Sequence, residues 1–144
     1  MSRPRLSCTS RKGTATAEMA VCLPVLMTLT LATMDLCSVF FLQETVTLAA
    51  YEGARVGVNR GGTNAEVVTR VQELLDERNV SYGGSPVSFE NATFDTAETL
   101  EHVTLVVTVP AAGNLIAPAG LYGDLELTAR VTMRKEFANE GAGQ

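Results

Sequence analysis

The chain has 144 residues, with 11 Lys and Arg against 16 Asp and Glu, and a formal net charge of −5. Four of the basic residues precede Glu18, so the chain beyond Leu42 carries 14 acidic residues and seven basic ones. This acidic balance excludes nucleic-acid binding, which requires a basic surface. The length fits one domain of ordinary size together with an anchor segment.

The first 13 residues are basic, and a long apolar stretch follows them. No charged residue occurs from Met19 to Met34, and the apolar pattern resumes from Leu36 to Leu42 after Asp35. About 20 mostly apolar residues are enough for a helix to cross a bilayer. We therefore predict a leader at 1–13, a transmembrane helix at 14–42 and, by the positive-inside tendency, export of everything after it.

The boundary between leader and apolar stretch has a specific pattern, because Glu18 is the fifth residue after Gly13. This spacing resembles the type IV prepilin signal, with cleavage between Gly13 and Thr14. Together with the downstream string AAYEGARVG, the first 58 residues resemble the TadE-like family of pseudopilins from tight-adherence (Flp-type) pilus systems. The matching positions are Gly13, Glu18, Leu23, Pro24, Asp35, Ala49, Ala50, Glu52, Gly53, Ala54 and Arg55. The chain departs from the family by having Thr14 and Thr16 where Ala is frequent, and Asp35 where Glu is more usual.

The resemblance implies a non-enzymatic minor pilin or pseudopilin in the bacterial inner membrane, with its N-terminus inside and a pilin-like domain outside. It also implies three partners besides the lipid bilayer: a prepilin peptidase, other pilin or pseudopilin subunits, and platform proteins of pilus assembly. In such proteins the carboxylate of Glu18 neutralises the new amine of Thr14 in the same or a neighbouring subunit. The alternative is that Glu18 is hydrated among lipid headgroups. We expect Asp35 to reach water at the outer surface.

Two other functional classes stay open at this stage. One is a single-pass, signal-anchored protein whose extracytoplasmic domain binds a ligand or another protein. The other is a cleaved secretory protein, although Leu31-Ala32-Thr33 is a poor cleavage site because Thr is not the usual small residue before the cut.

The helical pattern continues beyond the membrane segment, over 43–58. Ala49, Gly53 and Gly57 form a stripe of small residues, which suits either a second helix or close packing on the chain's own sheet. Glu52 and Arg55 are spaced to pair. A second helix is predicted at 63–78, where Thr63 and Glu66 form a capping box and Glu66 can pair with Arg70.

After this helix the apolar period changes to two, which predicts strands at about 86–94, 102–109 and 124–136. The alternation indicates an antiparallel sheet with one covered face, and the two helices are the natural cover. The expected fold is α+β and pilin-like, over 43–137. The segment 110–123 is either a partner-binding loop or a loop folded onto the sheet, and 138–144 is expected to be a flexible tail.

No pattern of residues predicts catalysis or a cofactor. His102 is the only histidine, and Cys8, Cys22 and Cys37 all lie in the leader or the apolar stretch. Phosphate-binding, nucleophile-elbow and zinc-binding motifs are absent from the sequence. We therefore expect no enzymatic activity, no metal, no cofactor and no small-molecule substrate.

Overall fold

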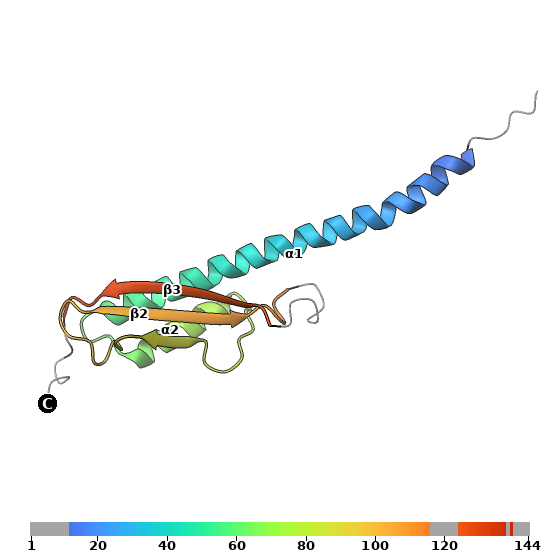
Figure 1. Ribbon diagram of the computed structural model, residues 1–144. Helices are drawn as coiled ribbons and strands as arrows, with labels where there is room; N and C mark the ends of the chain where they lie inside the picture. Colours follow the sequence, from blue (N-terminus) through green and yellow to red (C-terminus); the bar gives the residue numbers. More distant parts are fainter. Residues whose placement is uncertain (1–11, 116–123, 138, 140–144) are drawn as a thin grey trace, which may run out of the picture. The chain divides into compact units, whose positions relative to one another are not determined.

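The computed structural model describes residues 12–115, 124–137 and 139. In the described residues, two helices are followed by three strands (Figure 1). Their bounds are α1 (Lys12–Val58), α2 (Asn64–Glu77), β1 (Val87–Glu90), β2 (His102–Pro110) and β3 (Glu126–Arg134). This order and the antiparallel sheet confirm the predicted α+β class. The chain divides into two compact units, Met1–Met34 and Asp35–Gln144, which we describe separately.

The described part of the first unit is the N-terminal part of α1, whose side chains are exposed almost throughout. Among the described residues, α1 is the one helix long and apolar enough to cross a membrane. The hydroxyls of Thr28, Thr30 and Thr33 donate to backbone carbonyls one turn earlier, at 2.9, 2.7 and 2.8 Å. These polar groups are therefore satisfied within the helix, as hydrocarbon surroundings require.

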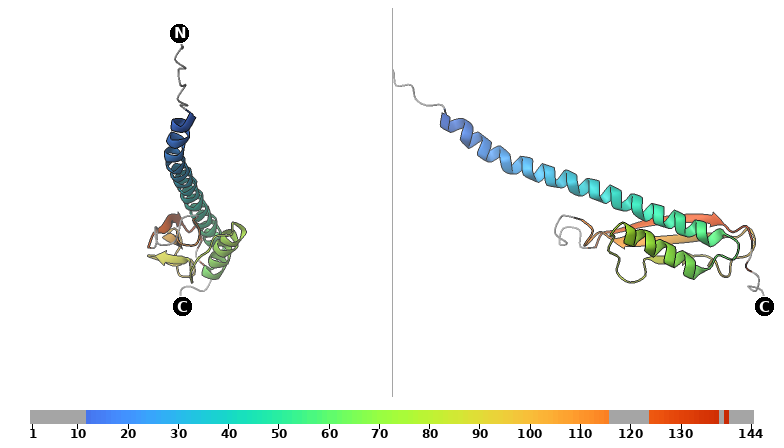
Figure 2. Two further views of the ribbon diagram at one scale, coloured as in Figure 1. Left: turned by 90° about the vertical axis from the view of Figure 1, so that its right-hand side faces the viewer. Right: turned by 180° about the vertical axis from the view of Figure 1, so that it is seen from behind.

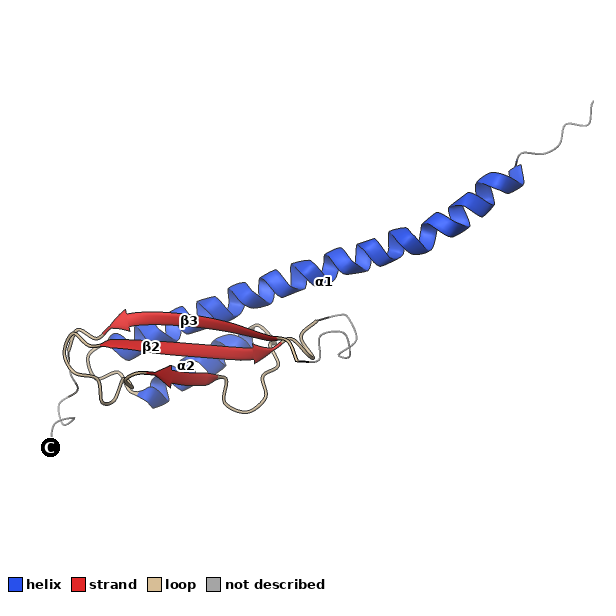
Figure 3. Ribbon diagram, in the orientation of Figure 1, coloured by secondary structure: helices blue, strands red, loops and turns tan. Residues whose placement is uncertain are grey.

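The second unit is built on a three-stranded antiparallel sheet in the order β1-β2-β3 (Figure 3). Leu105 in the central strand faces Phe89 on one side and Val131 on the other. Figures 1 and 2 show α2 and the later part of α1 against one face of this sheet. The core lies between these layers and contains Leu42, Val46, Ala49, Ala50, Ala54, Val67, Val71, Leu75, Phe94, Ala97, Val103, Leu105, Val107, Val109, Ala111, Leu127 and Ala129.

The strands are shorter at the edges of the sheet than the alternation predicts. β1 ends at Glu90 instead of extending to 94, because Asn91 has a φ of 70° and turns the chain away from the sheet. Phe94 is then fully buried and packs edge-to-face on Phe89, with 5.8 Å between ring centroids. β3 covers Glu126–Arg134 and not 124–136, while β2 is one residue longer than predicted.

The helix α2 begins as its sequence indicates. Thr63 accepts a hydrogen bond from the backbone N–H of Glu66, and the Glu66 carboxylate accepts one from the backbone N–H of Thr63, which confirms the capping box. The predicted pair of Glu66 and Arg70 is wrong. Arg70 instead pairs with Glu73 at 3.3 Å, because Glu66 is already engaged in the cap.

Lys135 is a buried charged residue that the alternation of the strand did not predict. Its side chain is 0% exposed, and Nζ donates to the backbone carbonyls of Gly62, at 3.3 Å, and of Phe94. Burial lowers the pKa of Lys135, and the nearby charge of Asp95 partly opposes that effect. The ammonium thus ties the end of β3 to the turn before α2 and to the loop after β1.

A tyrosine after α2 gives the fold a testable pH dependence. Tyr82 Oη donates to Asp76 Oδ1 at 3.1 Å, and partial desolvation, followed by this hydrogen bond and the charge of Asp76, raises the pKa of Tyr82 above 10.0. The phenol therefore contributes stability that is complete below pH 10.0 and is lost as the pH rises through the folded-state pKa.

Tyr82→Phe is expected to lower the free energy of unfolding at neutral pH by removing the bond to Asp76. Because the variant has no phenol to ionise, the difference in the free energy of unfolding between wild type and variant should shrink above pH 10.0. Urea unfolding of both full-length proteins in detergent, at neutral and alkaline pH, measures this difference. A difference that is constant across this pH range would refute the linkage.

Candidate processing and assembly site

The predicted cleavage site lies in the first turn of α1, where Gly13 and Thr14 are both exposed. A Cβ added to Gly13 would have no described atom within 4 Å apart from its chain neighbours and the backbone of its own helix. The fold therefore places no steric demand for glycine here, so a requirement for glycine would have to come from a processing enzyme. Of the predicted leader, residues 1–11 lie outside the described part of the chain.

Glu18 is exposed and lies one helical turn after Thr14, on the same side of α1. Side chains in a helix tilt toward its N-terminus, so the Glu18 carboxylate is directed toward the end where cleavage would create an ammonium. Four residues of helix span about 6 Å, which a glutamate side chain covers. This geometry suits pairing within one subunit, and the exposure of Glu18 leaves it equally accessible to a neighbouring chain.

Contrary to the prediction from the sequence, Asp35 does not reach water. It is 7% exposed and belongs to the second unit. The reason is helical periodicity, because Val39, Leu42 and Val46 follow it on the same stripe of α1 and pack into the core. Residues 35–42 of the predicted span 14–42 are thus part of the globular unit.

The stripe of small residues is covered by the chain's own fold. Ala49 is 0% exposed. A Cβ on Gly53 would approach Val71 Cγ2 of α2 to 2.6 Å, and one on Gly57 would approach the Phe94 ring to 2.6 Å. These residues therefore let α2 and the loop after β1 lie close to α1, and they leave no room for a helix of another subunit at these positions.

Gly57→Ala is expected to reduce the free energy of unfolding by about 1–2 kcal/mol. Overpacking a core destabilises the folded state by roughly 1–3 kcal/mol, whereas the higher helix propensity of Ala stabilises it by up to about 1 kcal/mol. Gly83→Ala is the matched control, because a Cβ there has no atom within 4 Å. Urea unfolding of the full-length variants in detergent measures both effects. Adding Phe94→Leu should recover part of the loss, and equal losses in Gly57→Ala and Gly83→Ala would contradict the packing argument.

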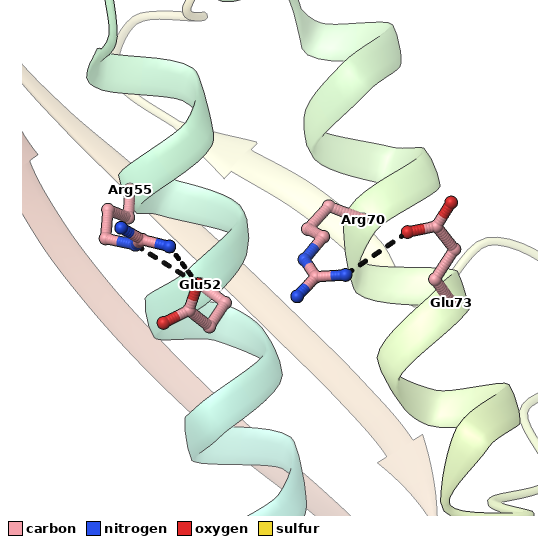
Figure 4. Close-up of polar contacts among 4 residues, drawn as sticks. All are labelled: Glu52, Arg55, Arg70 and Glu73. Atoms are coloured by element: carbon pink, nitrogen blue, oxygen red, sulfur yellow. Dashed lines mark hydrogen bonds and ion pairs between the residues drawn. The ribbon is translucent and has the colours of Figure 1, made fainter.

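Surface ion pairs flank this packed region (Figure 4). Arg55 donates to the Glu52 carboxylate at 2.8 Å, which confirms the pair expected from their spacing. Exposed pairs of this kind contribute only a few tenths of a kcal/mol, so Glu52 and Arg55 matter little for stability.

The remaining candidates for chemistry stand apart from one another. His102 is exposed at the start of β2, and Cys22 and Cys37 are exposed on α1. Within the residues that the structure describes, no three His, Cys, Asp or Glu side chains gather into a group that could hold a metal ion. The environments of Lys135 and Arg78 could not be predicted from the sequence, because a basic residue at the end of a strand or helix gives no indication of what surrounds it in the fold.

The comparisons with known proteins bear on the same segment. A family model described as "TadE-like protein" matches residues 13–55. The match begins at Gly13, includes Glu18 and ends at Arg55, the partner of Glu52. No match was found among curated proteins or among solved structures.

Proposed function

We propose that the protein is a minor pilin or pseudopilin of a tight-adherence (Flp-type) pilus or a related secretion apparatus, on the premise that residues 13–55 match the model of TadE-like proteins. The single observation that carries the proposal is the family match over one continuous helix that holds both the Gly13-to-Glu18 spacing and the Glu52–Arg55 pair. A membrane anchor is supported by the same helix, which is long and apolar enough to span a bilayer.

The proposed path begins with insertion of the chain into the bacterial inner membrane, with its basic N-terminus inside. A prepilin peptidase then cuts between Gly13 and Thr14, and Thr14 becomes the mature N-terminus. The ammonium of Thr14 and the carboxylate of Glu18 pair, because each isolated charge in hydrocarbon is costly and their attraction lowers that cost. Pairing within one subunit shields the new amine, and pairing between subunits fixes the stagger of neighbouring helices.

The proposed role is structural and needs no catalytic group. The second unit supplies an exported α+β domain, and the membrane helix supplies the assembly element. Partners in this proposal are other pilin or pseudopilin subunits and platform proteins of the assembly machine. The outward face of the sheet is polar, with a Thr104–Thr132 hydroxyl pair at 2.9 Å and Arg130 paired with Glu90 at 3.3 Å. Such a face suits solvent.

N-terminal sequencing of the protein purified from membranes of cells that contain a prepilin peptidase tests the proposal. A mature chain that starts at Thr14 supports it. A chain that keeps Met1 contradicts it and favours the signal-anchored binding protein, and a start beyond about Thr33 favours the cleaved secretory protein.

A further inference from the structure

The burial of Asp35 changes where a bilayer can end on this chain. If the outer boundary lay at Asp35, the distance along the helix from Glu18 would be about 25 Å, which is shorter than the roughly 30 Å of a hydrocarbon core. Because Asp35 is only 7% exposed, the next exposed charge on α1 after Glu18 is Glu44. The stretch between these two carboxylates covers about 39 Å of helix, which is enough for the core and part of one headgroup layer.

The extra length of this stretch carries exposed apolar side chains. Phe40 is 66% and Phe41 69% exposed, whereas Val39 and Leu42 on either side of them pack into the core of the second unit. Both aromatic rings therefore belong to a part of α1 that is already attached to the globular unit. Aromatic side chains are enriched at the membrane–water boundary, and exposure of two adjacent rings to water is costly.

One cationic side chain shares a hollow with each ring. Arg78, the C-cap residue directly after α2, lines a hollow of about 390 Å³ together with Phe41 and another of about 580 Å³ together with Phe40. The Arg78 guanidinium is exposed and makes no ion pair or hydrogen bond with the residues that the structure describes. Guanidinium groups bind phosphate oxygens in a two-pronged geometry, and each hollow has room for a phosphate group.

We infer that the end of the second unit formed by Phe40, Phe41 and Arg78 is a phospholipid-binding surface. The two rings enter the boundary between acyl chains and headgroups, and Arg78 binds a lipid phosphate just above them. Glu44 lines the same hollow as Phe40, and in this arrangement its exposed carboxylate stays in water. The inference rests on the membrane anchor of the proposed function, and it adds that the exported domain sits on the bilayer instead of being held clear of it.

The sequence contains no Trp, so single tryptophans can report depth in full-length protein. The test uses Phe40→Trp and Phe41→Trp in phosphatidylcholine vesicles whose acyl chains carry bromine as a quencher. Met27→Trp is the control inside the span. Phe137→Trp is the control outside it, because Phe137 is exposed, lines neither hollow and contacts Arg60 beyond the end of α1. We expect quenched, blue-shifted emission at positions 27, 40 and 41, and unquenched emission at position 137.

Each contrary outcome has one meaning. Quenching at position 27 but not at 40 or 41 overturns the inference and leaves the membrane anchor intact. A shielded, unquenched signal at 40 or 41 that disappears when protein is diluted into more lipid identifies a second copy as the occupant, and also overturns it. Absence of quenching at position 27 refutes the anchor and the proposed function together.

The role of Arg78 is tested in the Phe41→Trp protein. Arg78→Gln should shift the emission toward longer wavelength and reduce quenching, because loss of the phosphate contact lets this end of the domain lift from the bilayer. Arg134→Gln, which removes an exposed charge at the end of β3, is the matched control and should change neither signal. Equal spectra for the Arg78 variant and its parent would refute the phosphate contact.

Discussion

Gly13→Leu is expected to leave the 13-residue leader attached to essentially all of the protein. In the proposed processing step, the residue before the cut must fit a peptidase that accepts glycine. Apart from the chain neighbours and the backbone of its own helix, no described atom lies within 4 Å of a Cβ at Gly13, so a leucine there is not expected to disturb the packing of the domain. The intact mass of the membrane-bound protein, measured in cells with an active prepilin peptidase, gives the result directly.

Gly83→Leu is the control for this experiment, because Gly83 also has open space around it but lies far along the chain from the leader. It should be processed like the wild type. Full processing of Gly13→Leu would show that cleavage does not depend on this glycine and would remove the main support for a prepilin signal.

Glu18→Ala is expected to abolish incorporation into assemblies while leaving membrane insertion and folding unchanged. An unpaired charge in hydrocarbon costs about 2.5–3.5 kcal/mol, which corresponds to roughly a hundredfold weaker association. The domain should be unaffected because Glu18 is exposed and belongs to the first unit. Recovery of partner subunits with the tagged variant, compared with the wild type, measures the loss.

Two matched variants make the Glu18 result specific. Glu18→Asp keeps the charge and should retain most of the assembly, since aspartate shortens the reach by one methylene. Glu44→Ala removes another exposed carboxylate of α1 and should have little effect on assembly. Normal recovery of partners with Glu18→Ala, or an equal loss with Glu44→Ala, would show that pairing with the Thr14 amine is not what Glu18 provides.

Local sequence patterns predicted most of the secondary structure of this protein. The apolar run and the Gly13-to-Glu18 spacing predicted the long helix and agree with the family match over residues 13–55. The capping box at Thr63 predicted the start of α2, and the alternation predicted the three strands, although β1 and β3 are shorter than expected. These features can be predicted because each depends on residues within one or two turns of helix or one strand, where periodicity and capping act directly.

The tertiary structure alone decided which side chains are covered. Asp35 is buried because its stripe of α1 faces the core, and Gly57 is closed off by Phe94, which is distant in the sequence. Lys135 is enclosed by carbonyls from two other connections, and Arg78 shares a hollow with each of Phe40 and Phe41 because α2 ends there. The physical reason is that burial and electrostatic environment arise from contacts between distant segments, which no local pattern of residues specifies.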